Sequence, residues 1–358
     1  MTFKKKVVKE IPGFEYIHSD IVLIPGFRGS KLVNDKTKKT GWISLCTPFL
    51  PHSKESIDLP LNITKHEQDS TTSSTSINGT IIHQPFKLHK FSYDWRRTNE
   101  SSTEIFIKFL QDIYNNNGNK KIYIIAHSNG GLISLSTLHQ HPHLIGGIIF
   151  AGTPFGGAPG IFGNLRHGIP ILFNKKFQDD AAHFALRTVF SLMPPKLDAF
   201  KDQDDSTKYA NIDYFDVEEW KNSDWSLAIN EDNPRYNELG TRQERIDYLQ
   251  RTLEAAKRFH KTLEKPSENF EYPPLCTLVS NIHLTNGGYP MGKLDDGRHS
   301  ILYDKAIAAD GDSAVPIERT KLPEGIPFEV VHTDNSHGSL LEDLEAVGKA
   351  LQTIFNKH

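Results

Sequence analysis

A serine flanked by small residues is the first feature of this sequence that could do chemistry. Residues 126–130 read Ala-His-Ser-Asn-Gly, after an apolar run at 122–126 and before an amphipathic run at 129–139. A sharp strand–turn–helix connection needs small residues two positions before and after its serine, because larger side chains would collide with the strand and the helix. The helix N-terminus favours developing negative charge. The pattern predicts that Ser128 is a nucleophile for acyl transfer.

A serine hydroxyl needs a general base, and position selects one among the 17 histidines. In the fold that carries this turn, an Asp or Glu follows the serine in the chain, and a His follows the last strand. His337 lies between an apolar run at 328–332 and the last amphipathic run. His332 competes with it, but it ends the strand, which favours a structural role. We therefore expect His337 to be the base.

The acid of such a triad is expected just before that last strand. Residues 310–316 read Asp-Gly-Asp-Ser-Ala-Val-Pro and carry two carboxylates. One of them could accept the Nδ1–H of the histidine and stabilise the imidazolium. We expect Asp312 in this role, with Asp310 as the alternative and Asp304 and Asp295 as more distant ones.

Two backbone N–H groups are expected to stabilise the oxyanion. One is that of Asn129, directly after the nucleophile, and the other should come from the loop after an early strand. Residues 25–29, Pro-Gly-Phe-Arg-Gly, follow the apolar run at 21–24, and Phe27 is the candidate donor. An ordinary glycine turn is the alternative interpretation of this loop. There is no Cys/His cluster with zinc spacing and no glycine-rich phosphate loop, so we expect neither a metal nor a cofactor.

The elements that would position these residues alternate between strand and helix. Short runs that are apolar on both faces are typical of buried parallel strands, and runs with a period of 3.6 residues indicate amphipathic helices. The Ser-Ser-Thr-Glu pattern at 101–104 resembles a capping box and predicts a helix start there. The order predicts an α/β fold with a mostly parallel, doubly wound sheet. The expected strands are 21–24, 122–126, 144–150, 275–279 and 328–332, and helices are expected over 101–113, 129–139, 243–263 and 340–355.

Two stretches interrupt the alternation. Residues 33–90 are irregular and contain a Ser/Thr-rich tract at 69–78, which predicts a loop tip without packing. Helical patterns dominate residues 157–274. We expect a single catalytic domain over residues 1–358, with a lid-like insertion at 33–90 and a cap insertion at 157–274.

Composition excludes several classes of protein. The 41 Lys and Arg against 44 Asp and Glu give a net charge of −3, whereas nucleic-acid binding usually needs a clustered basic excess. No apolar run is long enough for a transmembrane segment, and the first residues have no apolar signal core. There are two cysteines, Cys46 and Cys276. We therefore expect a cytoplasmic setting and no nucleic-acid partner.

Six short motifs occur in order along the chain: residues 25–32, 93–96 (Tyr-Asp-Trp-Arg), 126–131, 152–157 (Gly-Thr-Pro-Phe-Gly-Gly), 311–316 and His337. Together they resemble the lecithin:cholesterol acyltransferase and group XV phospholipase A2 family. The resemblance implies an α/β-hydrolase core with a lid and a cap, acyl-ester chemistry on lipids, and a place for Trp42 in the lid. The chain departs from the family pattern at Asn129, where Met is usual, and at Ser313 and Ala314, which replace Gly and Thr. Cys46 has no second cysteine nearby to form the lid disulfide of secreted members.

Three function hypotheses follow. The first is a serine acyl-ester hydrolase or acyltransferase acting on lipid esters, phospholipase- or transacylase-like, through an acyl-enzyme. The second is a carboxylesterase or lactonase acting on a smaller soluble ester, and the third is a non-catalytic α/β-hydrolase that binds lipid. The apolar run at 42–50 favours lipid and transient contact with a lipid surface, although core packing of the insertion would also explain it. We expect Trp42, Phe49 and Phe155 to line the lid and the substrate pocket.

Overall fold

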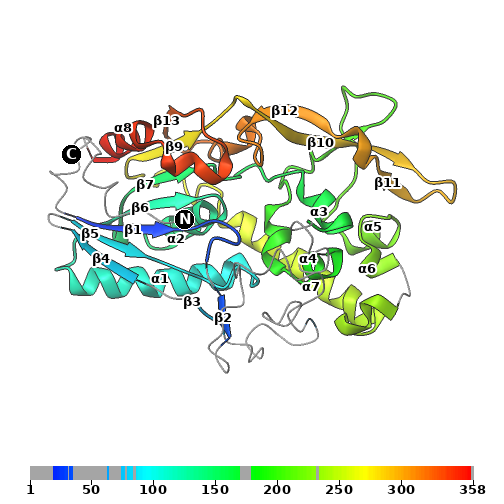
Figure 1. The fold of residues 1–358 in the computed structure, drawn as a ribbon, viewed down its shortest axis with the longest axis horizontal. Helices are drawn as coiled ribbons and strands as arrows, with labels where there is room; N and C mark the ends of the chain where they lie inside the picture. The colour runs from blue at the N-terminus through cyan, green and yellow to red at the C-terminus, as the bar shows by residue number, and fades with distance from the viewer. Residues whose placement is uncertain are drawn as a thin grey trace, which may run out of the picture.

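A seven-stranded sheet forms the centre of the protein (Figure 1). The computed structural model describes residues 19–30, 32–34, 63, 74–76, 79–83, 86–169, 179–230 and 234–355. β4 runs antiparallel to β5 at one edge, and every other pair of neighbours in this sheet is parallel. The expected mostly parallel α/β architecture is confirmed. In sheet order the strands are β13 (Glu329–His332), β9 (Leu275–Val279), β7 (Ile145–Ala151), β6 (Ile122–His127), β1 (Asp20–Ile24), β5 (Phe86–Lys90) and β4 (Gly79–His83).

Helices cover both faces of the sheet, which is why its central strands are apolar on both sides. Alternate residues of β7 point to opposite faces, so Phe150 packs in the same hydrophobic cluster as α1 (Asn99–Asn116) and α2 (Asn129–Gln140). Ile149 belongs to a second cluster, with α8 (Leu344–Phe355). Figure 1 shows α1 and α8 on opposite sides of the sheet.

Helix α1 begins earlier than its sequence predicts. Thr98 is the N-cap, and its side chain accepts a hydrogen bond from the N–H of Ser101 at 3.2 Å. The expected capping box at 101–104 therefore lies inside the first turn. A threonine three residues upstream can cap equally well, and the local pattern does not distinguish the two. Ile105 is 47% exposed, whereas Phe106 and Leu110 are buried, so the second and third of these residues form the buried face of α1.

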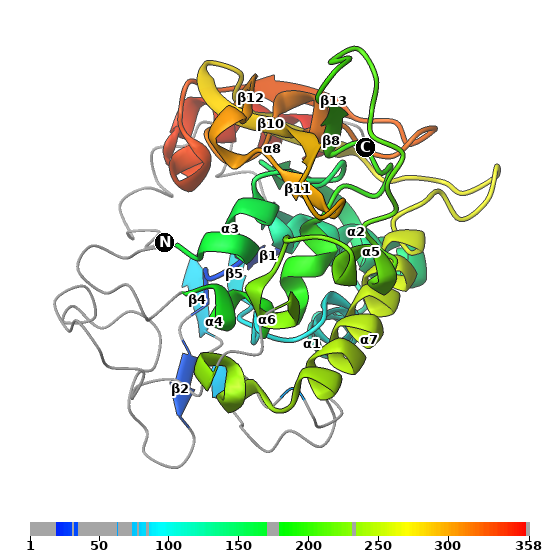
Figure 2. The same cartoon turned by 90° about the vertical axis from the view of Figure 1, so that its right-hand side faces the viewer.

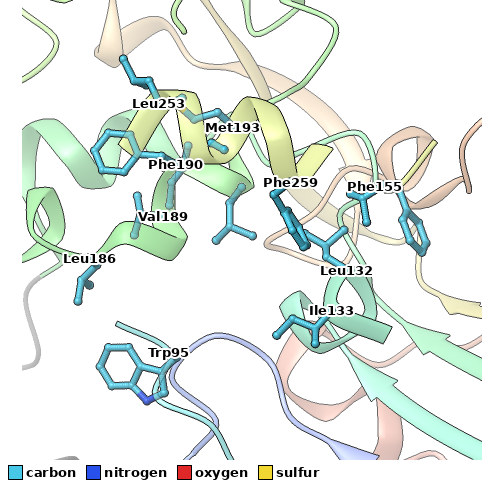
Figure 3. Packing of buried hydrophobic residues seen from close by; sticks show 14 of the residues in the cluster. Trp95, Leu132, Ile133, Phe155, Leu186, Val189, Phe190, Met193, Leu253 and Phe259 are labelled. Carbon is cyan, nitrogen blue, oxygen red and sulfur yellow. The ribbon is translucent and has the colours of Figure 1, made fainter. Parts of the chain in front are cut away.

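The segment between β7 and β9 is mostly helical and packs onto the core. Figure 2 shows its helices in front of the sheet. Leu253 and Phe259 of α7 belong to the same hydrophobic cluster as Leu132 and Ile133 of α2 (Figure 3). The cap range of 157–274 thus shares its core with the sheet domain. Its elements are α3 (Ile161–His167), α4 (Asp180–Phe184), η6 (Arg187–Leu192), β8 (Phe200–Asp202), α5 (Val217–Lys221), α6 (Leu227–Asn230), η7 (Pro234–Leu239) and α7 (Arg242–Lys261).

A second, smaller sheet was not expected from the sequence. It lies in the chain between β9 and β13, and β10 forms its centre, antiparallel to β11 and β12 and parallel to β8 of the cap. Glycines at 287, 288 and 292 interrupt the apolar alternation of β10, which hides the strand from a periodicity search. The strands are β10 (His283–Lys293), β11 (His299–Ile301) and β12 (Ile307–Gly311), and the 3-10 turns η8 (Tyr303–Lys305) and η9 (Ile317–Thr320) flank β12.

The lid range of 33–90 is too long at its end. β4 and β5, at 79–83 and 86–90, belong to the central sheet. Within the Ser/Thr tract, β3 (Ser74–Ser76) pairs antiparallel with β2 (Leu32–Asn34), so part of the expected loop tip is strand. β-Branched threonine favours extended backbone, and this preference opposes the polar character of the tract. The rest of the range, apart from residue 63, lies outside the described residues.

The final described segment contains two helices, because a 3-10 turn, η10 (His337–Glu342), precedes α8. Another 3-10 turn, η5 (Pro142–Leu144), connects α2 to β7 earlier in the chain. Leu340, expected in the final helix, therefore lies in the 3-10 turn. Within the part of the chain that the structure describes, no helix is long and apolar enough to cross a membrane.

Candidate active site

Ser128 sits in the sharp turn between β6 and α2. Its φ of 52° and ψ of −125° lie outside the regions that a serine usually adopts. Its N–H donates to the carbonyl oxygen of Ala151 at 2.8 Å, and its own carbonyl accepts from Gly131 at 2.9 Å. Such strained backbone persists where the surrounding structure holds it, and it is concentrated at functional sites.

The small residues around Ser128 are required by close backbone packing. A Cβ on Gly130 would lie 2.6 Å from the carbonyl oxygen of Pro25, and a Cβ on Gly26 would lie 2.7 Å from the Cβ of Ser128. Ala126 is fully buried. The loop after β1 and the serine turn thus touch each other, and this is the reason for glycine on both sides of the contact.

Asp312 and His337 form a hydrogen-bonded pair. The imidazole Nδ1 of His337 lies 2.7 Å from Oδ2 of Asp312, and the N–H of His337 donates to the carbonyl oxygen of Asp312 at 2.7 Å. The other carboxylate oxygen of Asp312 accepts from the N–H groups of Ala314 and Val315. Asp312 is 1% exposed. Because both of its carboxylate oxygens accept hydrogen bonds, the orientation of the carboxylate is fixed.

The alternative residues are not brought to this pair. His332, the competing histidine, is exposed at the end of β13. The alternative acids are exposed as well: Asp310, Asp304 and Asp295.

Gly152 is a position of the candidate site that sequence reasoning missed. It follows Ala151, whose carbonyl oxygen holds the N–H of Ser128. Its φ is +59°, and an added Cβ would lie 2.9 Å from Oδ2 of Asp312 and 3.0 Å from Nδ1 of His337. Gly152 therefore lies between the serine turn and the Asp–His pair. Its place at the start of the Gly-Thr-Pro-Phe-Gly-Gly motif was the signal that could have identified it.

His127 is a second residue that sequence reasoning missed. Its Nε2 lies 2.8 Å from the carbonyl oxygen of His337. Burial, followed by repulsion from His337, lowers the pKa of His127 to about 4. The side chain is therefore neutral near pH 7, and its Nε2–H can donate to the His337 carbonyl.

The loop with the expected oxyanion donor Phe27 is fixed by its neighbours. Gly29 donates to Gly26 and closes the turn around Phe27. The ring of Phe27 packs edge-on against Trp95, with ring centroids 5.5 Å apart. The indole Nε1–H of Trp95 donates in turn to the carbonyl oxygen of Ser30. The Tyr-Asp-Trp-Arg motif thus positions the loop that contacts Ser128.

The expected oxyanion donor Asn129 is the first residue of α2, so its N–H has no acceptor within the helix. Its side chain is fully buried.

Arg28, next to Phe27, contacts the cap, where its guanidinium lies against the imidazole of His183 in α4. Burial lowers the pKa of Arg28 to about 9.

The three expected pocket residues have different outcomes. Phe155 is buried in the hydrophobic core, with its ring centroid 5.1 Å from that of Phe150. Trp42 and Phe49 lie outside the described residues, so their pocket role stays a prediction. Among the residues that the structure describes, no group of three or more His, Cys, Asp or Glu could hold a metal ion.

Comparisons with known proteins agree with this architecture. A sequence model of the family described as lecithin:cholesterol acyltransferase matches residues 82–272, more than half of the chain. The "Uncharacterized protein YJR098C" of Saccharomyces cerevisiae is 27% identical over 412 residues, covering 94% of this chain and 62% of the yeast protein. "Lecithin-cholesterol acyltransferase-like 4" of Arabidopsis thaliana is 35% identical over 89 residues, covering 23% of this chain and 17% of that protein. The matches therefore span less than two thirds of either relative.

The fold also matches a solved structure. A chain of the Tle4–Tli4 complex aligns with a TM-score of 0.58 and 12% identity, covering 94% of this chain and 99% of that one. At this identity the likeness concerns the fold alone. With the sheet order and the turn between β6 and α2, it confirms the α/β-hydrolase fold expected from the sequence.

Proposed function

The chain belongs to the lecithin:cholesterol acyltransferase family, and from that premise we propose that it is a serine acyl-ester hydrolase or acyltransferase acting on lipid esters. One observation carries the proposal: the 2.7 Å contact between His337 and Asp312, adjacent to the turn that presents Ser128. A nucleophile, a base and an orienting acid in this chain order constitute the machinery of acyl transfer.

The proposed reaction proceeds through an acyl-enzyme. Oγ of Ser128 attacks the ester carbonyl carbon while Nε2 of His337 takes the hydroxyl proton. The tetrahedral intermediate collapses, the bond to the alcohol oxygen breaks, and His337 returns the proton to the leaving alkoxide. Water or another alcohol then attacks the acyl carbon with His337 again as base, the bond to Oγ of Ser128 breaks, and His337 returns the proton to Oγ. Asp312 keeps Nδ1 protonated and stabilises the imidazolium.

The charge that forms on the carbonyl oxygen requires donors already in place. We assign the N–H groups of Phe27 and Asn129 to this oxyanion hole. The contact of Gly26 with the Cβ of Ser128 supports Phe27, and the place of Asn129 directly after the nucleophile supports the second donor.

The lipid substrate class rests on the family and on the apolar run at 42–50. We propose that this run forms a lid over the site and that residues 157–274 form its cap. An apolar lid closes in water and opens where it can be buried in aggregated substrate. The rate should therefore rise when an ester substrate passes from monomers to micelles or vesicles.

Active-site labelling tests the proposed mechanism. A serine-directed fluorophosphonate should modify wild type at Ser128, and Ser128→Ala should lose both the label and the esterase activity. Labelling at another serine, or unchanged activity in Ser128→Ala, would overturn the assignment.

Lid variants test the substrate class. Trp42→Ser and Phe49→Ser should reduce the rate on phosphatidylcholine vesicles more than the rate on p-nitrophenyl acetate. Equal losses on both substrates would indicate core packing of the run and favour a smaller soluble ester as substrate.

A further inference from the structure

Two buried asparagines, one of which directly follows Ser128 in the chain, form a closed pair of hydrogen bonds. Nδ2 of Asn99 donates to Oδ1 of Asn129 at 2.8 Å, and Nδ2 of Asn129 donates back to Oδ1 of Asn99 at 2.9 Å. Both residues are 0% exposed. Asn99 is the first residue of α1 and Asn129 the first of α2, so the pair joins two helix N-termini.

Two further residues complete the network. Asn129 donates its second amide hydrogen to the hydroxyl of Tyr93 at 3.1 Å, and the hydroxyl of Thr188 donates to Oδ1 of Asn99 at 2.8 Å. Both amide hydrogens and the carbonyl oxygen of Asn129 are then used. The four side chains come from the loop after β5, from α1, from the serine turn and from η6 of the cap.

This network restricts the backbone of Asn129. A buried amide that loses a partner retains the full cost of its removal from water, so the side chain has one favourable arrangement. Only two rotatable bonds separate the amide from the backbone, and the N–H of Asn129 is therefore held with it. An oxyanion donor works within a narrow distance range of 2.7–3.1 Å, so restriction of this N–H bears directly on the rate.

The network also reaches the cap. Thr188 lies in η6, and its neighbours Val189 and Phe190 pack in the same cluster as Leu253 of α7 (Figure 3). Arg187, the residue before it, donates its N–H to the carbonyl oxygen of Arg96 at 3.0 Å. A displacement of η6 from the core would therefore remove the Thr188 hydroxyl from Asn99.

We propose that Asn99 and Thr188 are positioning residues for the acyl-transfer reaction: they hold the N–H of Asn129 in place and make its position dependent on the cap. This inference rests on the proposed function, because it needs Ser128 as nucleophile.

The test is a set of conservative substitutions with two readouts. Thr188→Val removes one hydroxyl at constant shape, and Asn99→Ala removes the partner of Asn129. We expect kcat on p-nitrophenyl acetate to fall about tenfold for Thr188→Val and about a hundredfold for Asn99→Ala, with KM changed less than about twofold. The inhibition constant of a trifluoromethyl ketone, whose adduct carries the oxyanion charge, should rise by the same factors.

Thr137→Val is the matched control. Thr137 is a fully buried threonine of α2 whose hydroxyl donates to Ile133, so its loss perturbs stability without touching the network. It should leave kcat and the inhibition constant within about twofold of wild type. If Asn99→Ala does not fold, Thr188→Val alone decides.

The outcomes separate the two proposals. If wild type carries the fluorophosphonate at Ser128 but Thr188→Val and Asn99→Ala behave like Thr137→Val, the positioning role is wrong and the mechanism stands. If kcat falls while the inhibition constant does not, the residues act on stability or access, and the inference also fails. If wild type is not labelled at Ser128, the proposed function fails first.

Discussion

The imidazole rings of His127 and His337 lie with their centroids 4.8 Å apart, and the first donates to the backbone carbonyl of the second at 2.8 Å. A charged imidazole at position 127 would oppose the imidazolium that the proposed mechanism forms on His337. Burial, followed by this repulsion, lowers the pKa of His127 to about 4, so the residue holds the His337 loop as a neutral donor.

The lowered pKa of His127 predicts acid sensitivity of the fold. The usual pKa of a histidine is 6.5, and that of His127 in the folded protein is about 4. Between these two pH values the unfolded chain binds a proton at His127 and the folded chain does not. The free energy of unfolding therefore falls as the pH falls through this window. His127→Gln can still donate a hydrogen bond but does not titrate. Urea unfolding at pH 7, 5.5 and 4.5 should show a smaller loss in His127→Gln than in wild type, and equal losses would refute the assignment.

The Asp312–His337 contact predicts which carboxylate serves the base. Asp312→Asn can hold the wrong imidazole tautomer, and kcat should fall on the order of ten-thousand-fold. Asp310→Asn is the control, because Asp310 is exposed two residues away. Steady-state kinetics on p-nitrophenyl acetate measure both variants. A large loss in Asp310→Asn with none in Asp312→Asn would reverse the choice.

The position of Gly152 predicts a severe effect from one added methyl group. Gly152→Ala places a Cβ 2.6 Å from Cδ1 of Leu340 and against the Asp312–His337 pair, at a φ of +59°. We expect kcat to fall at least about a hundredfold through displacement of His337. Gly118→Ala shares the positive φ, at +77°, but would meet nothing within 4 Å. It should show the backbone strain alone, as a lower melting temperature with full activity. Equal activities of the two variants would contradict this account.

The buried ion pair of the Tyr-Asp-Trp-Arg motif predicts a stability effect. Nε and Nη2 of Arg96 donate to the two carboxylate oxygens of Asp94 at 2.8 and 2.7 Å, and Arg96 is 1% exposed. Asp94→Asn removes the negative charge that accepts these two bonds from a buried cation and should lower the free energy of unfolding by about 3 kcal/mol. Glu345→Gln, which removes the exposed pair with Lys349 in α8, should cost less than about 1 kcal/mol. Denaturant titration measures the free energy of unfolding of both variants, and similar decreases in the two would contradict this prediction.

Local sequence patterns were sufficient to predict the core strands of the fold and the chain order of the candidate site residues. The apolar runs of β1, β6, β7 and β9 are continuous because both faces of these strands are buried, and this signal can be recognised without knowing which elements cover them. The turn at Ser128 is likewise local, since the small residues that it needs are adjacent in sequence. The expected end of the insertion at 33–90 and the expected start of α1 were less accurate, because strand edges and caps have several equivalent local solutions.

The tertiary structure decided what depends on distant pairs. Asp310 and Asp312 are two residues apart at the end of β12, but Asp312 alone of the two is buried against His337. Asn99 and Asn129 lie 30 residues apart, and no local sequence pattern predicts the hydrogen bonds between them. A Cβ at Gly152 would lie 3.0 Å from Nδ1 of His337, a residue far along the chain, and the motif around Gly152 does not name that neighbour. A local pattern records what each residue prefers by itself, whereas these contacts exist only after the sheet has brought its loops together.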